Sequence, residues 1–252
     1  MSTTVTIKDV SKKFSSEVVA LNCVSAEIKA NSFVSIVGPS GCGKSTLLRI
    51  IAGLVPATSG QITVGGKQVD GPISDSGMVF QGPVLLQWRT VLENILFVAE
   101  IGGKNARDYK ARALELIELA GLKGFENSYP HQLSGGMQQR ASICRALLLN
   151  PSLILMDEPF GALDVMTRER LGFELQDIWS ASKNTVIFVT HSITEAVLLS
   201  DTIIVMTARP GRIQNVIEVD LPRARTLETL RTPRFLELSA QVREGIGTQW
   251  EG

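Results

Sequence analysis

A glycine-rich loop between a strand pattern and a helix pattern constrains this chain more than any other feature. Residues 32–37 are mostly apolar, residues 38–45 read GPSGCGKS, and residues 47–51 (LLRII) continue with a helical pattern. The glycines let the backbone curl around a phosphate chain, so that N–H groups and the positive end of the following helix converge on the anion. Lys44 would reach the β- and γ-phosphates, and the Ser45 hydroxyl would ligate Mg²⁺. The loop therefore predicts nucleotide binding, because a glycine turn that matches by chance would lack the strand and the helix around it.

The overall composition limits the partners that this chain can have. It has 252 residues, of which 44% are hydrophobic, so it can bury a substantial core. Lys and Arg number 25 and Asp and Glu number 25, which argues against a broadly basic surface for nucleic acid. The three cysteines form no C-x-x-C pair and the N-terminus shows no charged-then-apolar leader, so we expect a reduced cytosolic compartment. No apolar run approaches the ~18 residues of a membrane span, so we expect partners to hold the protein at any membrane where it works.

The order of strand and helix patterns predicts one α/β domain with a helical insertion. Strand patterns occur up to Gln81, give way to apolar residues at helical spacing, and resume at Leu153. We expect a nucleotide-binding core (residues 1–82 and 152–222), an inserted helical subdomain (residues 83–151) and a C-terminal helical tail (residues 223–252). In the tail, one helical face carries Phe235, Leu238, Val242 and Ile246, which predicts a closing amphipathic helix.

Four polar side chains directly follow strand patterns. Gln81 follows one such pattern, Asp157 and Glu158 end an apolar run, and His191 follows another strand. Ligands of open parallel sheets bind beyond the carboxyl ends of the strands, so we expect these side chains to converge on one crevice. Asp157 suits holding Mg²⁺ through its waters, and Glu158 suits accepting a proton from an attacking water. For Gln81 and His191 the pattern leaves a role in phosphate chemistry and a plain surface position equally open.

Two further features allow both a functional and a structural interpretation. In the stretch LSGGMQQR, Ser134 can cap a helix whose first turn holds Gly135 and Gly136. This is either an ordinary helix cap or a second anion-binding helix terminus, which two copies placed head to tail would bring to the glycine-rich loop. Phe14 is either a ring that stacks on adenine or, as the pattern alone favours, a core residue.

Six motifs in order give the chain a resemblance to the ATP-binding subunits of ABC transporters. Residues 38–46 resemble the Walker A loop, residues 133–140 the family signature, residues 153–158 the Walker B strand and residues 161–164 (GALD) the D-loop, while Gln81 resembles the Q-loop glutamine and His191 the switch histidine. The resemblance implies a P-loop NTPase (RecA-like) core with an antiparallel β subdomain and an inserted α-helical subdomain. It also implies an ATPase that uses ATP and Mg²⁺.

The resemblance assigns a role to each matching residue. Catalysis would use Glu158, His191, Lys44 and Gln81, and the metal would be held by Ser45, Gln81 and Asp157. The nucleotide would be bound by Phe14, Gly38, Pro39, Ser40, Gly41, Cys42, Gly43, Lys44, Ser45, Thr46, Ser134, Gly135, Gly136 and Asp164. Because Cys42 lies beside Lys44 and a helix N-terminus, we expect a lowered thiol pKa and a reactivity that ATP blocks.

The resemblance also implies partners and a location. These are a second copy in a head-to-tail ATP-sandwich dimer, transmembrane permease subunits and, indirectly, a periplasmic or lipid-anchored solute-binding protein, with no nucleic acid. The subunit would lie peripherally at the cytoplasmic face of the inner membrane. Trp88 is a candidate permease contact, with a core role equally open. Residues 79–94 and 205–213 resemble the bacterial nitrate, sulfonate and taurine importer branch, which does not name the solute.

Two other functions are alternatives to that of a transporter subunit. The first is a non-transport ABC ATPase that acts on DNA, ribosomes or cluster assembly, which would usually carry coiled-coil insertions, tandem copies or basic arms. None of these is present in the sequence. The second is a P-loop kinase with a lid in place of the signature, which phosphate release without an acceptor would exclude.

Overall fold

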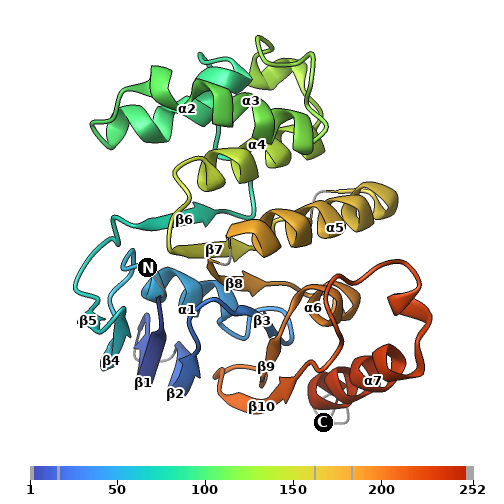
Figure 1. Cartoon of the computed structure of the whole chain (residues 1–252). Coiled ribbons are helices and arrows are strands. Elements are labelled where there is room, and N and C mark those ends of the chain that lie inside the picture. The colour runs from blue at the N-terminus through green and yellow to red at the C-terminus, as the bar shows by residue number, and fades with distance from the viewer. Residues whose placement is uncertain (1–2, 16–17, 162, 183, 248–252) are drawn as a thin grey trace.

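A six-stranded sheet in the order β10-β9-β3-β8-β7-β6 forms the centre of the fold (Figure 1). The computed structural model describes residues 3–15, 18–161, 163–182 and 184–247. The strands are β3 (Phe33–Val37), β6 (Ser76–Val79), β7 (Leu153–Asp157), β8 (Thr185–Val189), β9 (Thr202–Met206) and β10 (Ile213–Glu218). All neighbours pair in parallel except β9 and β10, which are antiparallel. Every residue of β3, β7 and β8 is buried, as expected for parallel strands covered on both faces.

Alternate residues of the central strands divide the core into two layers. Ile187 and Val189 of β8 face helix α1 (Lys44–Ile51) and the second sheet, whereas Val186 and Phe188 face the other helices. The second sheet is antiparallel in the order β2-β1-β4-β5. Its strands are β1 (Val5–Lys13), β2 (Val19–Ile28), β4 (Ser59–Val64) and β5 (Lys67–Gln68). Helix α1 is therefore held between two sheets, which fixes the loop that precedes it.

A helical lobe lies beyond β6 at the top of Figure 1. It contains α2 (Val91–Ile101), η1 (Ala106–Tyr109), α3 (Lys110–Leu119), η2 (Pro130–Gln132) and α4 (Gly135–Leu147). Helix α2 begins with a capping box between Thr90 and Glu93. The buried Asn94 side chain donates to the carbonyls of Leu86, Arg89 and Thr90 and accepts from the Leu86 N–H. This network fixes the segment that leads into the lobe. Trp88 lies on this segment and is 73% exposed, so the alternative of a core role for Trp88 is wrong.

The C-terminal residues pack onto the core. They follow α5 (Val165–Ser182) and α6 (Ile193–Leu199) and form η3 (Thr229–Arg231) and α7 (Pro233–Gly247). As expected, α7 buries Phe235, Leu238 and Val242, while Ile246 packs at the edge of the same cluster. The buried Arg225 guanidinium donates to the carbonyls of Val197, Leu198, Ser200 and Leu221, and burial lowers its pKa to about 10. The tail thereby closes the C-terminal end of α6.

Candidate active site

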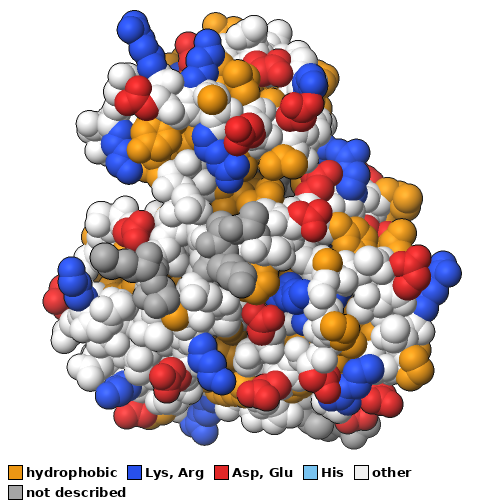
Figure 2. Space-filling model, in the orientation of Figure 1, with side chains coloured by type: hydrophobic (Ala, Val, Ile, Leu, Met, Phe, Trp, Pro, Cys, Tyr) orange, Lys and Arg blue, Asp and Glu red, His pale blue; other side chains and the backbone are white. Residues whose placement is uncertain are grey.

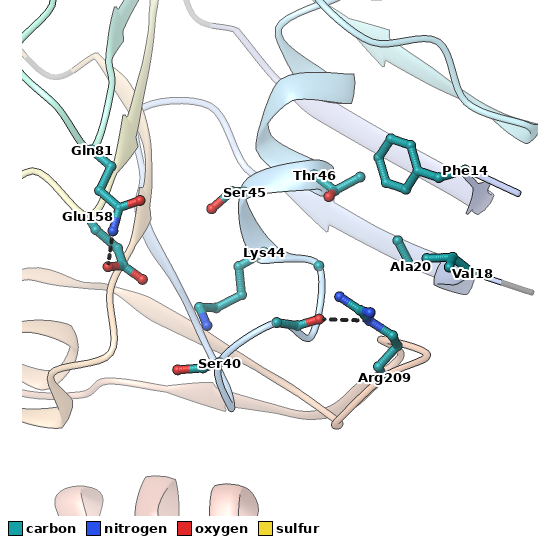
Figure 3. Close-up of a pocket in the computed structure, with 12 residues that line it drawn as sticks. Phe14, Val18, Ala20, Ser40, Lys44, Ser45, Thr46, Gln81, Glu158 and Arg209 are labelled. Carbon is teal, nitrogen blue, oxygen red and sulfur yellow. Dashed lines mark hydrogen bonds between the residues drawn. The ribbon is translucent and has the colours of Figure 1, made fainter.

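The glycine-rich loop forms a tight turn at the start of α1 (Figure 3). Gly43 has φ +100°, and a Cβ there would lie 2.8 Å from Leu21 Cδ2 and 2.9 Å from the Ala20 carbonyl oxygen. Only glycine fits this close approach to β2. Lys44 is buried, and its Nζ donates to the carbonyl oxygens of Gly38 (2.9 Å) and Pro39 (3.0 Å). The loop thus curls around its own lysine, as expected of a phosphate cradle.

A cavity of about 360 Å³ opens between this loop and the second sheet. It is lined by Phe14, Val18, Ala20, Ser40, Gly41, Gly43, Lys44, Ser45, Thr46, Gln81, Glu158 and Arg209. The Phe14 ring is 61% exposed and stands at one side of the cavity in Figure 3, which excludes the core alternative for this residue. Gln81 and Glu158 lie at the opposite side, beyond Lys44. The cavity therefore has room for a base next to Phe14 and for phosphates over the loop.

Ser45 and Asp157 meet beneath the loop. The Ser45 Oγ donates to Asp157 Oδ1 at 2.7 Å, and Asp157 is the last residue of the buried strand β7. Burial raises the pKa of the Asp157 carboxyl, which a divalent cation beside it would offset. In the part of the chain that the structure describes, no cluster of three or more His, Cys, Asp or Glu side chains could hold a metal. A hydroxyl and one carboxylate nonetheless fit Mg²⁺, which usually takes few protein ligands and completes its shell with phosphates and waters.

Three strand ends bring Gln81, Glu158 and His191 together. Gln81 Nε2 donates to Glu158 Oε2 at 3.2 Å, and His191 Nδ1 lies 3.4 Å from the same oxygen. Glu158 has φ +46°, a left-handed conformation that is rare for a residue other than glycine. Its N–H donates to the Val189 carbonyl at 2.9 Å, which holds the backbone in place. Strained backbone of this kind is concentrated at functional sites, and here it aims a carboxylate at the cavity.

The predicted signature residues lie elsewhere, on the first turn of α4. The Ser134 Oγ accepts from the Met137 N–H at 3.3 Å, so Ser134 caps the helix. None of Ser134, Gly135 and Gly136 lines the cavity. A Cβ at Gly136 would lie 2.8 Å from Leu163 Cδ2, whereas a Cβ at Gly135 would meet nothing within 4 Å among the described residues. Within one chain, the space next to Gly135 is therefore unoccupied by any described residue.

Asp164 also lies away from the cavity. Its carboxylate accepts from the Thr167 N–H at 3.0 Å at the start of α5, and this hydrogen bond lowers its pKa. Ala162, the second residue of the predicted D-loop, lies outside the described residues. Within one chain, Asp164 acts as a helix cap.

The expectation of a lowered thiol pKa at Cys42 is wrong. Its side chain is fully buried beneath the loop, with Sγ 3.9 Å from Lys44 Nζ. Burial raises the pKa of the Cys42 thiol, and this effect outweighs the opposing influence of the nearby Lys44 ammonium. The sequence shows the lysine and the helix terminus, but it does not show that the thiol points inward.

Sequence reasoning missed two groups near the site. Arg209, in the loop between β9 and β10, lines the cavity and donates from Nε to the Gly41 carbonyl at 3.2 Å. Behind the site, Glu195 Oε2 accepts from the Thr190 hydroxyl, and Glu195 Oε1 lies 3.5 Å from Arg168 Nε. Burial raises the pKa of the Glu195 carboxyl. The only sequence signal for Arg209 was its place in the stretch 205–213 that resembles one importer branch.

A phosphate cradle, a buried acidic strand end and a catalytic-type carboxylate on a parallel sheet define a P-loop nucleoside triphosphatase. The ABC transporter family profile matches residues 21–161, and the chain belongs to this family. It is 45% identical over 231 residues to the taurine import ATP-binding protein TauB of Rhizobium johnstonii, covering 89% of this chain and 87% of TauB. It is 44% identical over 248 residues to the aliphatic sulfonates import ATP-binding protein SsuB of Bacillus cereus, covering 96% and 98% of the two chains.

Solved structures agree with this assignment. A dimeric ATP-binding cassette in a post-hydrolysis state, bound to ADP and Pi, superimposes with a TM-score of 0.77 at 35% identity, covering 86% of this chain and 100% of that chain. The predicted fold class and the predicted ATP-binding, ATP-hydrolysing transporter subunit are thereby confirmed. Membership of the family excludes the P-loop kinase alternative.

Proposed function

We propose that this chain is the ATPase subunit of an importer for a small solute, in which residues 38–46, 81, 157, 158 and 191 carry ATP hydrolysis. The observation that carries this proposal is the convergence of Gln81 and His191 on one oxygen of Glu158, at 3.2 Å and 3.4 Å. This carboxylate borders the same cavity as the phosphate loop. The arrangement supplies a proton acceptor beside the expected position of the terminal phosphate.

Each residue of the site has a part in the proposed mechanism. The loop N–H groups and Lys44 bind the phosphates, for which Lys44 gives up its contacts with the Gly38 and Pro39 carbonyls. Mg²⁺, held by Ser45, Gln81 and Asp157, would neutralise charge on the phosphates. Glu158 accepts the proton of the attacking water, and Gln81 and His191 orient that water and the terminal phosphate.

The proposed working form is a head-to-tail dimer. The open Gly135 and the capped helix end at Ser134 would cover the nucleotide on the loop of a second copy, and Asp164 would lie at the same interface. The dimeric state of the solved relative bound to ADP and Pi supports this proposal. Residues 1–82 and 152–222 would form the core of each copy, residues 83–151 the inserted subdomain and residues 223–252 the tail.

The proposed membrane partner is a permease that docks between the lobe and the core. A cavity of about 570 Å³ lies there, and its lining includes Phe80, Phe97, Ile101 and Arg145. Trp88 is exposed beside the lobe, where it could contact a short permease helix. Among residues 3–15, 18–161, 163–182 and 184–247, no helix has the length and apolar character to span a bilayer. The relatives TauB and SsuB are named as import ATP-binding proteins, which supports a peripheral position of this subunit at the cytoplasmic face of the inner membrane.

The proposed solute class follows from the relatives. TauB and SsuB are named for import of taurine and of aliphatic sulfonates, and both match most of this chain. We assign the solute to the nitrate, sulfonate and taurine group, with its choice made by the permease and a periplasmic or lipid-anchored binding protein.

The test of this function is Glu158→Gln. This change keeps the side-chain size but removes the proton acceptor, so we expect ATP turnover to fall by about 10²–10⁴-fold while ATP binding persists. We expect size-exclusion chromatography with ATP and Mg²⁺ to show a stable dimer of this variant. Normal hydrolysis by Glu158→Gln would show that another residue is the base. Co-purification with a permease, and none with nucleic acid, separates transport from the non-transport alternative.

A further inference from the structure

The loop between β9 and β10 is built against the phosphate loop. The Gly211 N–H donates to the Ala20 carbonyl at 2.9 Å, and the Gly211 carbonyl accepts from the Asn22 N–H at 3.0 Å. A Cβ at Gly211 would overlap the Cys42 carbonyl oxygen. Thr207 closes the turn by exchanging hydrogen bonds with Arg212. These contacts fix the loop against both β2 and the phosphate loop, so the side chain of Arg209 begins from a defined position.

Arg209 projects from this loop to the rim of the nucleotide cavity. Its Nε donates to the Gly41 carbonyl at 3.2 Å, and Figure 3 shows the guanidinium beside the phosphate loop and Ala20. Its two terminal nitrogens have no hydrogen-bond partner among the described residues. The guanidinium is therefore oriented by one bond and keeps donors for a ligand.

The charge of the cavity favours an anion at these donors. Of the side chains that line it, Lys44 and Arg209 are the cations, and Lys44 is buried under the loop. The whole chain carries 25 basic and 25 acidic residues, and Figure 2 shows basic and acidic side chains interspersed on its visible face, so an anion site depends on local cations. A guanidinium binds phosphate oxygens with charge-assisted hydrogen bonds.

The position of Arg209 indicates which part of the nucleotide it reaches. It lies near Ala20 and Val18 on the Phe14 side of the cavity, and Lys44 separates it from Gln81 and Glu158 (Figure 3). If the base lies next to Phe14 and the terminal phosphate lies next to Glu158, then the phosphates closest to the ribose lie beside Arg209. These phosphates are present in both ATP and ADP.

We propose that Arg209 is a nucleotide-binding residue, whose guanidinium contacts the phosphates nearest the ribose and so contributes to the affinity for both ATP and ADP. This inference rests on the proposed nucleotide site. It assigns a purpose to the tight packing of Gly211, because a loosely held loop could not keep the guanidinium at the rim. Since the contact is made equally before and during hydrolysis, it lowers KM without raising kcat.

The experiment compares Arg209→Gln with Arg212→Gln in the full chain. Arg212 lies in the same loop but against the side-chain amide of Asn22, and it does not line the cavity, so it is the matched control. Isothermal titration calorimetry should show the Kd of Mg-ADP and of ATP raised by about 10-fold in Arg209→Gln and unchanged in Arg212→Gln. ATPase assays should show KM raised by a similar factor, with kcat within about two-fold of wild type.

Salt provides a second measurement. The affinity difference between wild type and Arg209→Gln should shrink as KCl rises from about 50 mM to about 500 mM, because salt screens an exposed charge. A Kd within two-fold of wild type, or a fall in kcat with unchanged KM, would overturn the inference, the latter because Arg209 would then act only by bracing Gly41. A lowered melting temperature of the nucleotide-free variant together with an unchanged Kd of Mg-ADP would overturn it as well, because Arg209 would then only brace Gly41. Failure of the nucleotide site itself would appear separately, as binding that survives Lys44→Ala.

Discussion

Two helices of this chain, α1 and α4, begin with glycine-rich segments, and the surroundings of these two segments differ. At the start of α1, Gly43 lies against Leu21 and Ala20, so the fold itself requires a glycine there. At the start of α4, Gly135 has open space around its missing Cβ among the described residues. A helical glycine costs up to about 1 kcal/mol of stability relative to alanine. Packing within one chain explains the need for glycine at Gly43. Nothing among the described residues of one chain explains Gly135, whereas in the proposed dimer a second copy would approach it closely.

Lys44 supplies the cation of the phosphate loop at the start of α1, so its removal tests this site directly. Lys44→Ala should abolish measurable nucleotide binding, because Lys44 is the ammonium that the loop curls around. Fluorescent ATP analogues and calorimetry would measure this. Because Lys44 is buried in the loop, its loss could also destabilise the fold. Thermal unfolding of the nucleotide-free variant is therefore the control for folding. Unchanged affinity would refute the assignment of residues 38–46 as the phosphate loop.

A single methyl group at Gly135 would occupy the open space at the start of α4. Gly135→Ala should leave Mg-ADP binding unchanged, because Gly135 does not line the cavity, and should lower ATP turnover by about 10–100-fold by obstructing the second copy. The free energy of unfolding should stay equal or rise by about 0.5 kcal/mol. The matched control is Gly172→Ala in α5, where a Cβ would make an ordinary 3.6 Å contact with Leu198 Cδ2. Full turnover by a Gly135→Ala chain that stays monomeric with ATP would contradict the dimer proposal.

The sequence predicts some residues of the nucleotide site and not others. The phosphate loop, Asp157 and Glu158 follow buried strands, and strand ends on a parallel sheet can be placed from the sequence pattern. The inward direction of Cys42 and the position of Arg209 depend on packing between segments far apart in the chain, which no local pattern contains. Phe14 shows the same limit, because its place at an exposed cavity edge depends on how β1 lies beside the phosphate loop.

A partly buried ion pair between Glu195 and Arg168 connects the His191 side of the nucleotide site with the start of α4. Glu195 is tied to Thr190, next to His191, and to Arg168, whose Nη2 donates to the Leu163 carbonyl at 3.1 Å. Leu163 in turn packs on Gly136. Glu195→Gln should therefore lower turnover by about 5–10-fold with little change in nucleotide affinity, because it loosens the positions of His191 and Leu163 without touching the nucleotide.

The control for this pair is an exposed ion pair in α7. Arg234 and Glu237 lie 3.1 Å apart at the surface, so Glu237→Gln should change neither turnover nor stability measurably. Glu195→Gln should also lower the free energy of unfolding by about 1–3 kcal/mol. If Glu195→Gln loses stability but keeps wild-type kcat at every ATP concentration, the pair is structural only.

Burial of the Cys42 thiol inside the phosphate loop should keep this thiol nearly unreactive in the native protein. Cys23 is exposed, whereas Cys42 and Cys144 are buried, and burial raises the pKa of Cys42 and takes the pKa of Cys144 to about 12. Thiolate is the reactive form, so in the native protein a thiol reagent should label Cys23 rapidly and the other two slowly. A Cys23→Ser variant should then show almost no fast labelling, with or without ATP, and should keep wild-type ATP affinity after exposure to the reagent. Fast labelling that ATP suppresses in this variant would mean that the phosphate loop opens in solution far enough to expose Cys42. In that case Gly43 would not stay packed on Leu21, and this packing would not explain why the loop needs glycine.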